Sequence, residues 1–298
     1  MAYHESVLLN ESVDGLNIQP NGIYVDATFG GGGHSRTILE KLKNGKLFAF
    51  DQDADVILNK IEDQRFVLID QNFRFMKQFL RLKGVRKVDG ILADLGVSSY
   101  QFDTARRGFS IRKDGPLDMR MNHSQSLTAK VVINDYELED LVRIFKNYGE
   151  LRNAYTIAQQ IVKTRQSSEI ETTEQLKAVV EYLIQSHKRN KILAQFFQAI
   201  RIEVNDELKA LKELLEQSVE LLKEGGRISV ISYHSLEDRL VKNIIRSGNF
   251  DGHIEKDFFG NKKVVLKALN KKPIVASPEE ILKNPRSRSA KLRISQKL

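Results

Sequence analysis

The chain of 298 residues contains no cysteine. It therefore has no disulfide framework, no thiolate zinc site and no cysteine nucleophile. It also has no apolar run near the roughly 20 residues that cross a bilayer, and its first residues lack the basic and then apolar pattern of a signal peptide. We expect a globular protein of the cytoplasm that has no membrane partner.

Negative charge is in deficit, because 47 lysines and arginines face 39 acidic residues and leave a net charge of +8. This balance fits either a solvated basic surface or a protein that binds a polyanion. Several basic residues flank glycine, aromatic or polar loop residues, which favours a groove that contacts phosphates. The clusters are Arg106–Arg107, Arg112–Lys113, Lys188–Arg189 with Lys191, Lys271–Lys272, and the tail residues Lys283, Arg286, Arg288, Lys291 and Arg293.

A glycine loop follows the first apolar run of the chain, in the segment Val25–Ser35. Glycines permit positive φ and close backbone approach, and a helix that begins after them offers unpaired N–H groups to a ligand. A dinucleotide fingerprint would need a third glycine at position 35, which is Ser35. The spacing from Asp26 through Gly30 to Gly32 is instead typical of loops that bind S-adenosylmethionine. A tight turn without a ligand is the alternative.

Short apolar runs alternate with helical stretches from residue 22 to about residue 95, the pattern of parallel βαβ units. Three predicted strands end on Asp26, Asp51 and Asp94, and the carboxyl ends of parallel strands meet at one edge of the sheet. We expect a ligand at that edge. The expected strands are 23–27, 46–50, 66–69, 89–95 and 227–232, with 263–266 and 290–294 as an antiparallel edge.

Strand signals nearly vanish between residues 105 and 201, where apolar residues recur at helical spacing. Thr172 and Gln175 form a capping box at the start of one helix. A long helix over 206–222 is expected to end at Gly225–Gly226 before the next strand. The predicted fold is an α/β Rossmann-like sheet with an inserted all-helical domain, so that 1–104 and 205–298 form one domain and 105–204 form the insertion.

Individual polar residues suggest the chemistry of the site. Asp51 follows Gly33 by 18 residues, close to the spacing at which an acidic residue binds ribose hydroxyls. The turn that begins at Asp94 is able to accept a hydrogen bond from an amine. His34 and His234 either reach the cofactor or are satisfied loop histidines. The other histidines have no metal spacing, so we expect no metal.

Eight stretches of the sequence resemble the bacterial ribosomal RNA small subunit methyltransferase H family, also called MraW. Together they extend over the whole chain and are far more specific than the glycine loop alone. They are His4–Leu9, Asp26–Ser35, Asp94–Ser99 with Gln101, Arg107–Ser110, Asp114–Met121, Phe197–Asn205, Ser232–Arg239 and Asn284–Ser289.

The resemblance implies S-adenosylmethionine as cofactor and methylation of the exocyclic N4 of a decoding-centre cytidine in 16S rRNA. The substrate partner would be the small ribosomal subunit, and a homodimer is left open. The implied cofactor contacts are Gly32, Gly33, His34, Asp51, Phe73, Asp94 and Gln101, and the basic residues expected at the RNA are Arg107, Arg120, Arg286 and Arg288.

Asp94, or the turn that follows it, is expected to hold the N–H groups of the cytosine amine as an acceptor, and Asp94 is the expected catalytic residue. Methyl transfer is an in-line displacement that needs no covalent intermediate. Methylation at C5 of a pyrimidine normally needs a cysteine, so that route is closed. The alternatives are an RNA-binding ribosome assembly factor, a methyltransferase for another RNA, a protein or a small molecule, and, more distantly, a nicotinamide oxidoreductase.

Overall fold

The computed structural model describes residues 6–256, 258–259 and 264–298. The chain divides into two compact units, of which the first comprises Met1–Gly96 and Leu208–Leu298, and the second Val97–Glu207. The insertion expected over 105–204 lies within the second unit, which also includes residues 97–104 and 205–207. Each unit has a hydrophobic core of its own.

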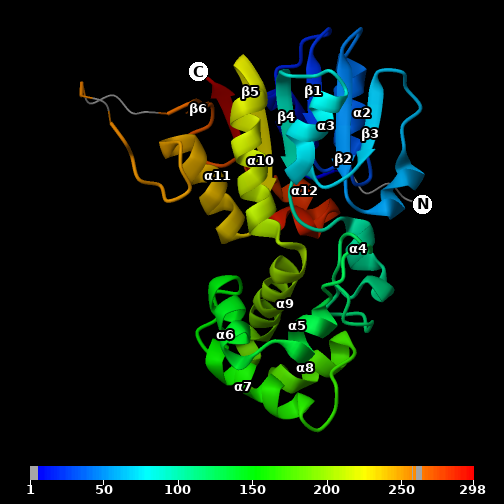
Figure 1. Cartoon of the computed structure of the whole chain (residues 1–298), viewed down its shortest axis with the longest axis vertical. Helices are drawn as coiled ribbons and strands as arrows, with labels where there is room; N and C mark the ends of the chain where they lie inside the picture. Colours follow the sequence, from blue (N-terminus) through cyan, green and yellow to red (C-terminus); the bar gives the residue numbers. More distant parts are fainter. Residues whose placement is uncertain (1–5, 257, 260–263) are drawn as a thin grey trace. The chain divides into compact units, whose positions relative to one another are not determined.

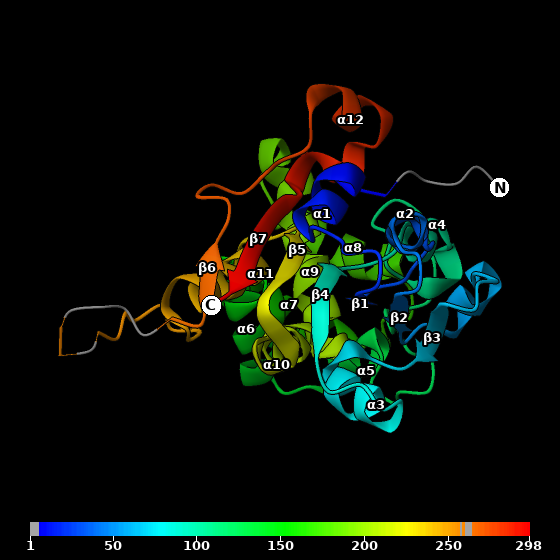
Figure 2. The ribbon, with the colours of Figure 1, turned by 90° about the horizontal axis from the view of Figure 1, so that it is seen from above.

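The first unit is built on a seven-stranded sheet in the order β3-β2-β1-β4-β5-β7-β6 (Figure 2). All neighbouring pairs are parallel except those of β7, which is antiparallel to both β5 and β6. The expected antiparallel edge is therefore confirmed. The strands are β1 Ile23–Asp26, β2 Lys46–Asp51, β3 Phe66–Asp70, β4 Val88–Asp94, β5 Leu222–Ser232, β6 Leu266–Ala268 and β7 Lys291–Lys297.

Two sequence predictions about these strands need correction. The strand expected over 263–266 is Leu266–Ala268, and residue 263 lies outside the described residues. The helix expected over 206–222 is α10, Glu207–Leu221, but β5 begins at Leu222, before the pair Gly225–Gly226, and not at Arg227. The pairing of β5 with β4 shifts register between Leu222 and Arg227, and Gly225 in that interval has φ +76°. The two glycines thus form a bulge inside the strand and do not end the helix.

Helices cover both faces of the sheet (Figure 2). Side chains of α1 and α2 pack on one face, and those of α3, α10 and α11 pack on the other, because each helix presents an apolar stripe to the buried strands. This layering leaves the strand ends and their loops as the polar rim of the unit. The helices are α1 Leu9–Gly15, α2 Gly33–Lys41, α3 Met76–Leu82, α10 Glu207–Leu221, α11 Ser235–Ser247 and α12 Pro278–Lys283, with 3-10 helices η1 Ala54–Asn59, η2 Phe73–Phe75 and η5 Pro285–Ser289.

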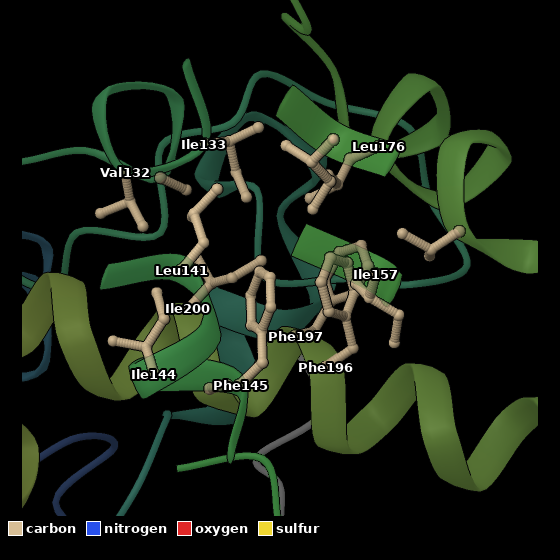
Figure 3. Close-up of a cluster of buried hydrophobic side chains, with 14 of the residues drawn as sticks. Val132, Ile133, Leu141, Ile144, Phe145, Ile157, Leu176, Phe196, Phe197 and Ile200 are labelled. Atoms are coloured by element: carbon tan, nitrogen blue, oxygen red, sulfur yellow. The ribbon is translucent and has the colours of Figure 1, made fainter. Parts of the chain in front are cut away.

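The second unit is helical and closes around a cluster of aliphatic and aromatic side chains (Figure 3). The rings of Phe145 and Phe196 pack with their centroids 4.9 Å apart. The predicted capping box is present, since the side chains and backbone N–H groups of Thr172 and Gln175 bond reciprocally. The helices, drawn in Figure 1, are α4 Ser99–Asp103, α5 Ala129–Asp135, α6 Leu138–Asn147, α7 Ala154–Arg165, α8 Thr173–Glu181 and α9 Arg189–Asn205, with η3 Ala105–Arg107 and η4 Ser186–Lys188.

A search of the described residues finds no helix both long enough and apolar enough to cross a membrane.

Candidate cofactor and active site

The glycine loop connects the end of β1 to the start of α2. Gly30 and Gly32 have φ of +50° and +77°, a region that side chains disfavour. Arg36 donates the first helical hydrogen bond of α2, to the carbonyl of Gly32 at 2.9 Å. The N–H groups of Gly33, His34 and Ser35 precede it and so have no acceptor within the helix. The loop therefore combines bare backbone with a helix start, as the sequence predicted.

Three carboxylates lie at the carboxyl ends of neighbouring strands β2, β1 and β4. The central one, Asp26, is fully buried and accepts hydrogen bonds from the Ser35 hydroxyl at 2.7 Å and the Thr28 N–H at 3.1 Å. Thr28 in turn accepts the N–H of Asp94 at 2.7 Å through its hydroxyl. Asp26 thus fixes the start of α2 and the loop, and its burial raises its pKa to about 6.

Asp51 is half-buried at the end of β2. Its two carboxylate oxygens accept the N–H of Gly30 at 2.8 Å and of Asp53 at 3.0 Å. Burial raises the pKa of Asp51 to about 6, and the two backbone N–H groups oppose that rise. Each oxygen keeps a further lone pair, so Asp51 is able to accept hydroxyl groups beside the glycine loop.

Asp94 is half-buried at the end of β4, and one of its oxygens is already engaged. The Tyr233 hydroxyl donates a hydrogen bond of 2.7 Å to Asp94 Oδ1. Burial raises the pKa of Asp94 to about 6, while nearby His34 and the Tyr233 hydroxyl act in the opposite direction. Within residues 6–256, 258–259 and 264–298, no group hydrogen-bonds to the second oxygen, Oδ2, which is therefore able to accept a proton or a hydrogen bond from a ligand.

His34 and Phe73 extend the site. His34 is 4% exposed, its Nε2 lies 3.2 Å from the Val7 carbonyl, and burial lowers its pKa, which keeps the ring neutral near pH 7. The ring is thus packed inside the protein and donates a hydrogen bond to the Val7 carbonyl. Phe73 opens η2 just after β3 and is half-buried. Asn72 donates a bond of 2.8 Å to Gln52, which ties the loop after β3 to the loop after β2.

The second unit contains three of the predicted site residues. Gln101 is buried, and its side-chain oxygen accepts the Ser98 N–H at 3.1 Å in the capping box of α4. Its contact with a cofactor stays a prediction of the resemblance.

The RNA contacts of Arg107 and Arg120 stay predictions, and the structure shows internal partners for both guanidinium groups. Arg107 is 1% exposed and donates hydrogen bonds to the carbonyls of Arg120 at 3.0 Å and Met121 at 3.1 Å. Arg120 forms a two-pronged ion pair with Asp118, with Nε to Oδ1 and Nη2 to Oδ2 both at 2.8 Å. Both guanidinium groups stabilise the loop around Asp118, because buried or bidentate arginines satisfy internal acceptors.

Arg286 and Arg288, in contrast, are exposed in η5. This short helix precedes β7, whose first residue Lys291 pairs with Ser232 at the carboxyl end of β5. The two arginines therefore lie at the same edge of the sheet as Asp94, where phosphates can reach them.

Comparison with known proteins gives one family match that includes the entire chain. Residues 1–298 match the MraW methylase family. The chain belongs to this family. It is 58% identical over 299 residues to the ribosomal RNA small subunit methyltransferase H of Flavobacterium johnsoniae and to that of Christiangramia forsetii, and each alignment covers 100% of the chain and 99% of the relative.

Solved structures similar to this MraW methylase include an rRNA methylase of Streptococcus thermophilus, with 12% identity, a TM-score of 0.45, and coverage of 100% of this chain and 99% of that one. Another is a methylase from Clostridium thermocellum, described as a putative rRNA-methylase, with 12% identity, a TM-score of 0.47 and full coverage of both chains. The sheet and the family together confirm the predicted fold class, and the chain is a methyltransferase.

Sequence reasoning did not single out Tyr233 in this MraW methylase, and it left His234 as either a cofactor contact or a satisfied loop histidine. His234 precedes α11 and caps it, with Nδ1 3.4 Å from the Glu237 N–H. Glu237 is 3% exposed and accepts the Tyr233 N–H at 2.8 Å. The signal that identifies Tyr233 is positional, because a residue just after β5 lies beside the end of β4 once the strand order is known.

Proposed function

We propose that this methyltransferase transfers the methyl group of S-adenosylmethionine to the exocyclic N4 of a cytidine in the decoding centre of 16S rRNA. The name of the relatives supports the small-subunit rRNA as substrate class. The observation that carries the proposal is Asp94, a half-buried carboxylate beside the glycine loop with one oxygen held by Tyr233 and one left for an amine.

The residues at the strand ends fit this cofactor. A Cβ added at Gly30 or Gly31 would meet no atom within 4 Å, so open space borders the bare backbone of the loop. Asp51 has acceptor capacity left for a pair of ribose hydroxyls. We propose that the cofactor is held at this edge by Gly32, Gly33, His34, Asp51, Phe73 and Asp94.

When bound, S-adenosylmethionine supplies a methyl group on a positively charged sulfur, which keeps the C–S bonding pair as that bond breaks. The reaction at the amine then depends on the protein. The lone pair of a cytosine amine is delocalised into the ring, and Asp94 favours the attacking geometry by accepting one N–H. The nitrogen forms its bond to the methyl carbon and loses one proton to Asp94 Oδ2 or to water.

The cytidine has to leave its stack to reach this edge, either from an open loop or by flipping. Arg286 and Arg288 are the groups of the first unit that we propose hold the neighbouring phosphates. Their exposure and their place before β7 support this role.

The first experiment is mass mapping of methylated nucleosides in 16S rRNA from cells with and without the protein. We expect a single N4-methylated cytidine in the decoding centre to disappear without the protein and to return with the wild-type chain. Loss of a different nucleoside would point to another RNA site. Unchanged rRNA despite tight binding of the protein to subunits would favour the assembly-factor alternative.

The second experiment replaces Asp94 with asparagine, which keeps the shape of the side chain but does not take up the proton. We expect methyl transfer to fall by roughly 10²-fold or more, the size of a lost general base, while cofactor affinity changes by only a modest factor. Asp89→Asn is the matched control, because Asp89 lies at the other end of β4, where it accepts the Ile23 N–H at 2.8 Å and pairs with Lys223. Near wild-type transfer by the Asp94 variant would contradict the assigned role.

A further inference from the structure

Two features place Tyr233 beside Asp94. One is the hydrogen bond between their side chains, and the other is the pairing of β5, which precedes Tyr233, with β4. Ile231 of β5 pairs with Asp94 of β4 in the parallel ladder, and Tyr233 follows two residues later. Its backbone N–H is held by the buried Glu237 carboxylate at 2.8 Å, and its hydroxyl reaches Asp94 Oδ1 at 2.7 Å. The tyrosine is therefore fixed before it meets the carboxylate.

We propose that Tyr233 is a positioning residue for methyl transfer, whose hydroxyl engages Asp94 Oδ1 and leaves Oδ2 directed to the acceptor amine. This inference rests on the proposed function. The final torsion of an aspartate is broad, so an unbound carboxylate would rotate and present either oxygen. The backbone of Asp94 is also anchored, because its N–H donates to the Thr28 hydroxyl at 2.7 Å. Together the two bonds define one orientation.

The titratable groups with the largest effects on the pKa of Asp94 come from several elements. They are His34 of α2, Asp26 of β1, Glu237 of α11 and Tyr233 itself. Asp26 and Glu237 disfavour the carboxylate anion, and a charged His34 would favour it, but burial keeps His34 neutral. The Tyr233 hydroxyl is thus a donor that stabilises the anion while His34 is uncharged.

Tyr233 keeps its own proton throughout the proposed step. Burial and the neighbouring Asp94 raise its pKa well above the usual value, so the phenol remains a donor. The proton that leaves the amine is taken up at Asp94 Oδ2 or by water, and no proton passes through the tyrosine. Its contribution is orientation and stabilisation of the anion.

The test is the pH dependence of kcat for Tyr233→Phe at saturating RNA and S-adenosylmethionine. Loss of a hydrogen bond to a charged acceptor makes the Asp94 anion less favourable, so the acid limb should move upward by about one pH unit and kcat at pH 6 should fall roughly fivefold. The KM for S-adenosylmethionine should change less than about threefold, since the variant keeps Asp94 and the other residues proposed to hold the cofactor. A purely structural tyrosine would lower activity without moving the limb.

Tyr136→Phe is the matched control. Tyr136 donates a similar bond to a carboxylate, Glu203 Oε1 at 3.1 Å, in the second unit, and its loss should leave the acid limb in place. If Tyr233→Phe does not fold, 3-fluorotyrosine introduced at position 233 keeps the ring and strengthens the donor, and it should move the limb to lower pH.

The outcomes separate this inference from the function on which it rests. A wild-type chain that does not methylate 16S rRNA overturns the proposed function and the positioning role with it. A wild-type chain that does methylate, together with Tyr233 variants that keep its acid limb, overturns the positioning role alone.

Discussion

At the scale of single residues, the three strand-end carboxylates differ in what their partners leave available. Asp26 is enclosed by Ser35 and Thr28 and acts within the protein. Asp51 accepts two backbone N–H groups, and Asp94 accepts one phenol. All three have a pKa raised to about 6 by burial, yet only Asp51 and Asp94 are partly open to solvent. The same residue type thus takes different roles through its hydrogen bonds.

The proposed contact of Asp51 with the cofactor should make cofactor affinity depend on pH. Its ionised form accepts hydroxyl groups, and with a pKa of about 6 the ionised fraction falls about tenfold between pH 7 and pH 5. We expect the affinity for S-adenosylhomocysteine, measured by calorimetry, to weaken by a similar factor on acidification. Asp51→Asn should weaken binding at pH 7 by roughly tenfold or more, as for a lost charged hydrogen bond, and should reduce the pH dependence.

Asp70→Asn is the control for that measurement. Asp70 is exposed at the end of β3 and is the register partner of Asp51 in the next strand, so it shares the edge without sharing the loop contacts. Its replacement should leave both the affinity and its pH midpoint unchanged. If Asp51→Asn shows the same pH midpoint and the same loss of affinity on acidification as the wild type, another group is responsible for the titration.

At the scale of elements, the connection from β1 to α2 leaves space for a side chain at one glycine and not at its neighbour. A Cβ at Gly32 would lie 2.7 Å from the Arg36 guanidinium and 2.9 Å from the Phe29 ring, in a backbone with φ +77°. A Cβ at Gly31 meets no atom within 4 Å. We expect Gly32→Ala to lower the free energy of unfolding by about 1–2 kcal/mol, the cost of a left-handed alanine, and Gly31→Ala to change it little. Urea unfolding of the two variants measures the difference, and equal losses would contradict this geometry.

The sequence predicts well those helices and strands whose signals come from residues close together in the chain. The strand that ends at Asp94 and the capping box at Thr172 depend on neighbours in the chain. A glycine pair such as Gly225–Gly226 predicts a helix stop as readily as a bulge inside a strand, and only the pairing with β4 distinguishes the two.

The contacts of Tyr233 and Arg107 could not be predicted from the sequence for a related reason. Tyr233 lies 139 residues from Asp94, so their contact depends on strand order. Arg107 looks like a surface cation in sequence, but its carbonyl partners lie 13 and 14 residues away in a loop whose path the sequence does not reveal.

At the scale of the whole molecule, the net charge of +8 predicts attraction to RNA, while the fold predicts where that attraction is effective. Arg286 and Arg288 lie at the carboxyl edge of the sheet with Asp94. Lys83 and Arg86 are equally exposed, but they precede β4 and so lie at its amino end. Removing either pair lowers the net charge equally.

The salt dependence of RNA binding should therefore separate charge from position. For Arg286→Gln with Arg288→Gln, we expect the slope of log K against log salt concentration to decrease in magnitude by about 1.4, since each of the two lost phosphate contacts changes it by roughly 0.7. The double variant Lys83→Gln and Arg86→Gln should preserve the slope. These two residues lie at the amino end of β4, away from the edge where we propose that RNA phosphates bind. Binding of a 16S rRNA fragment at several salt concentrations measures both slopes. Equal reductions in the two variants would mean that net charge, and not the edge beside the methyl-transfer site, determines how the RNA is held.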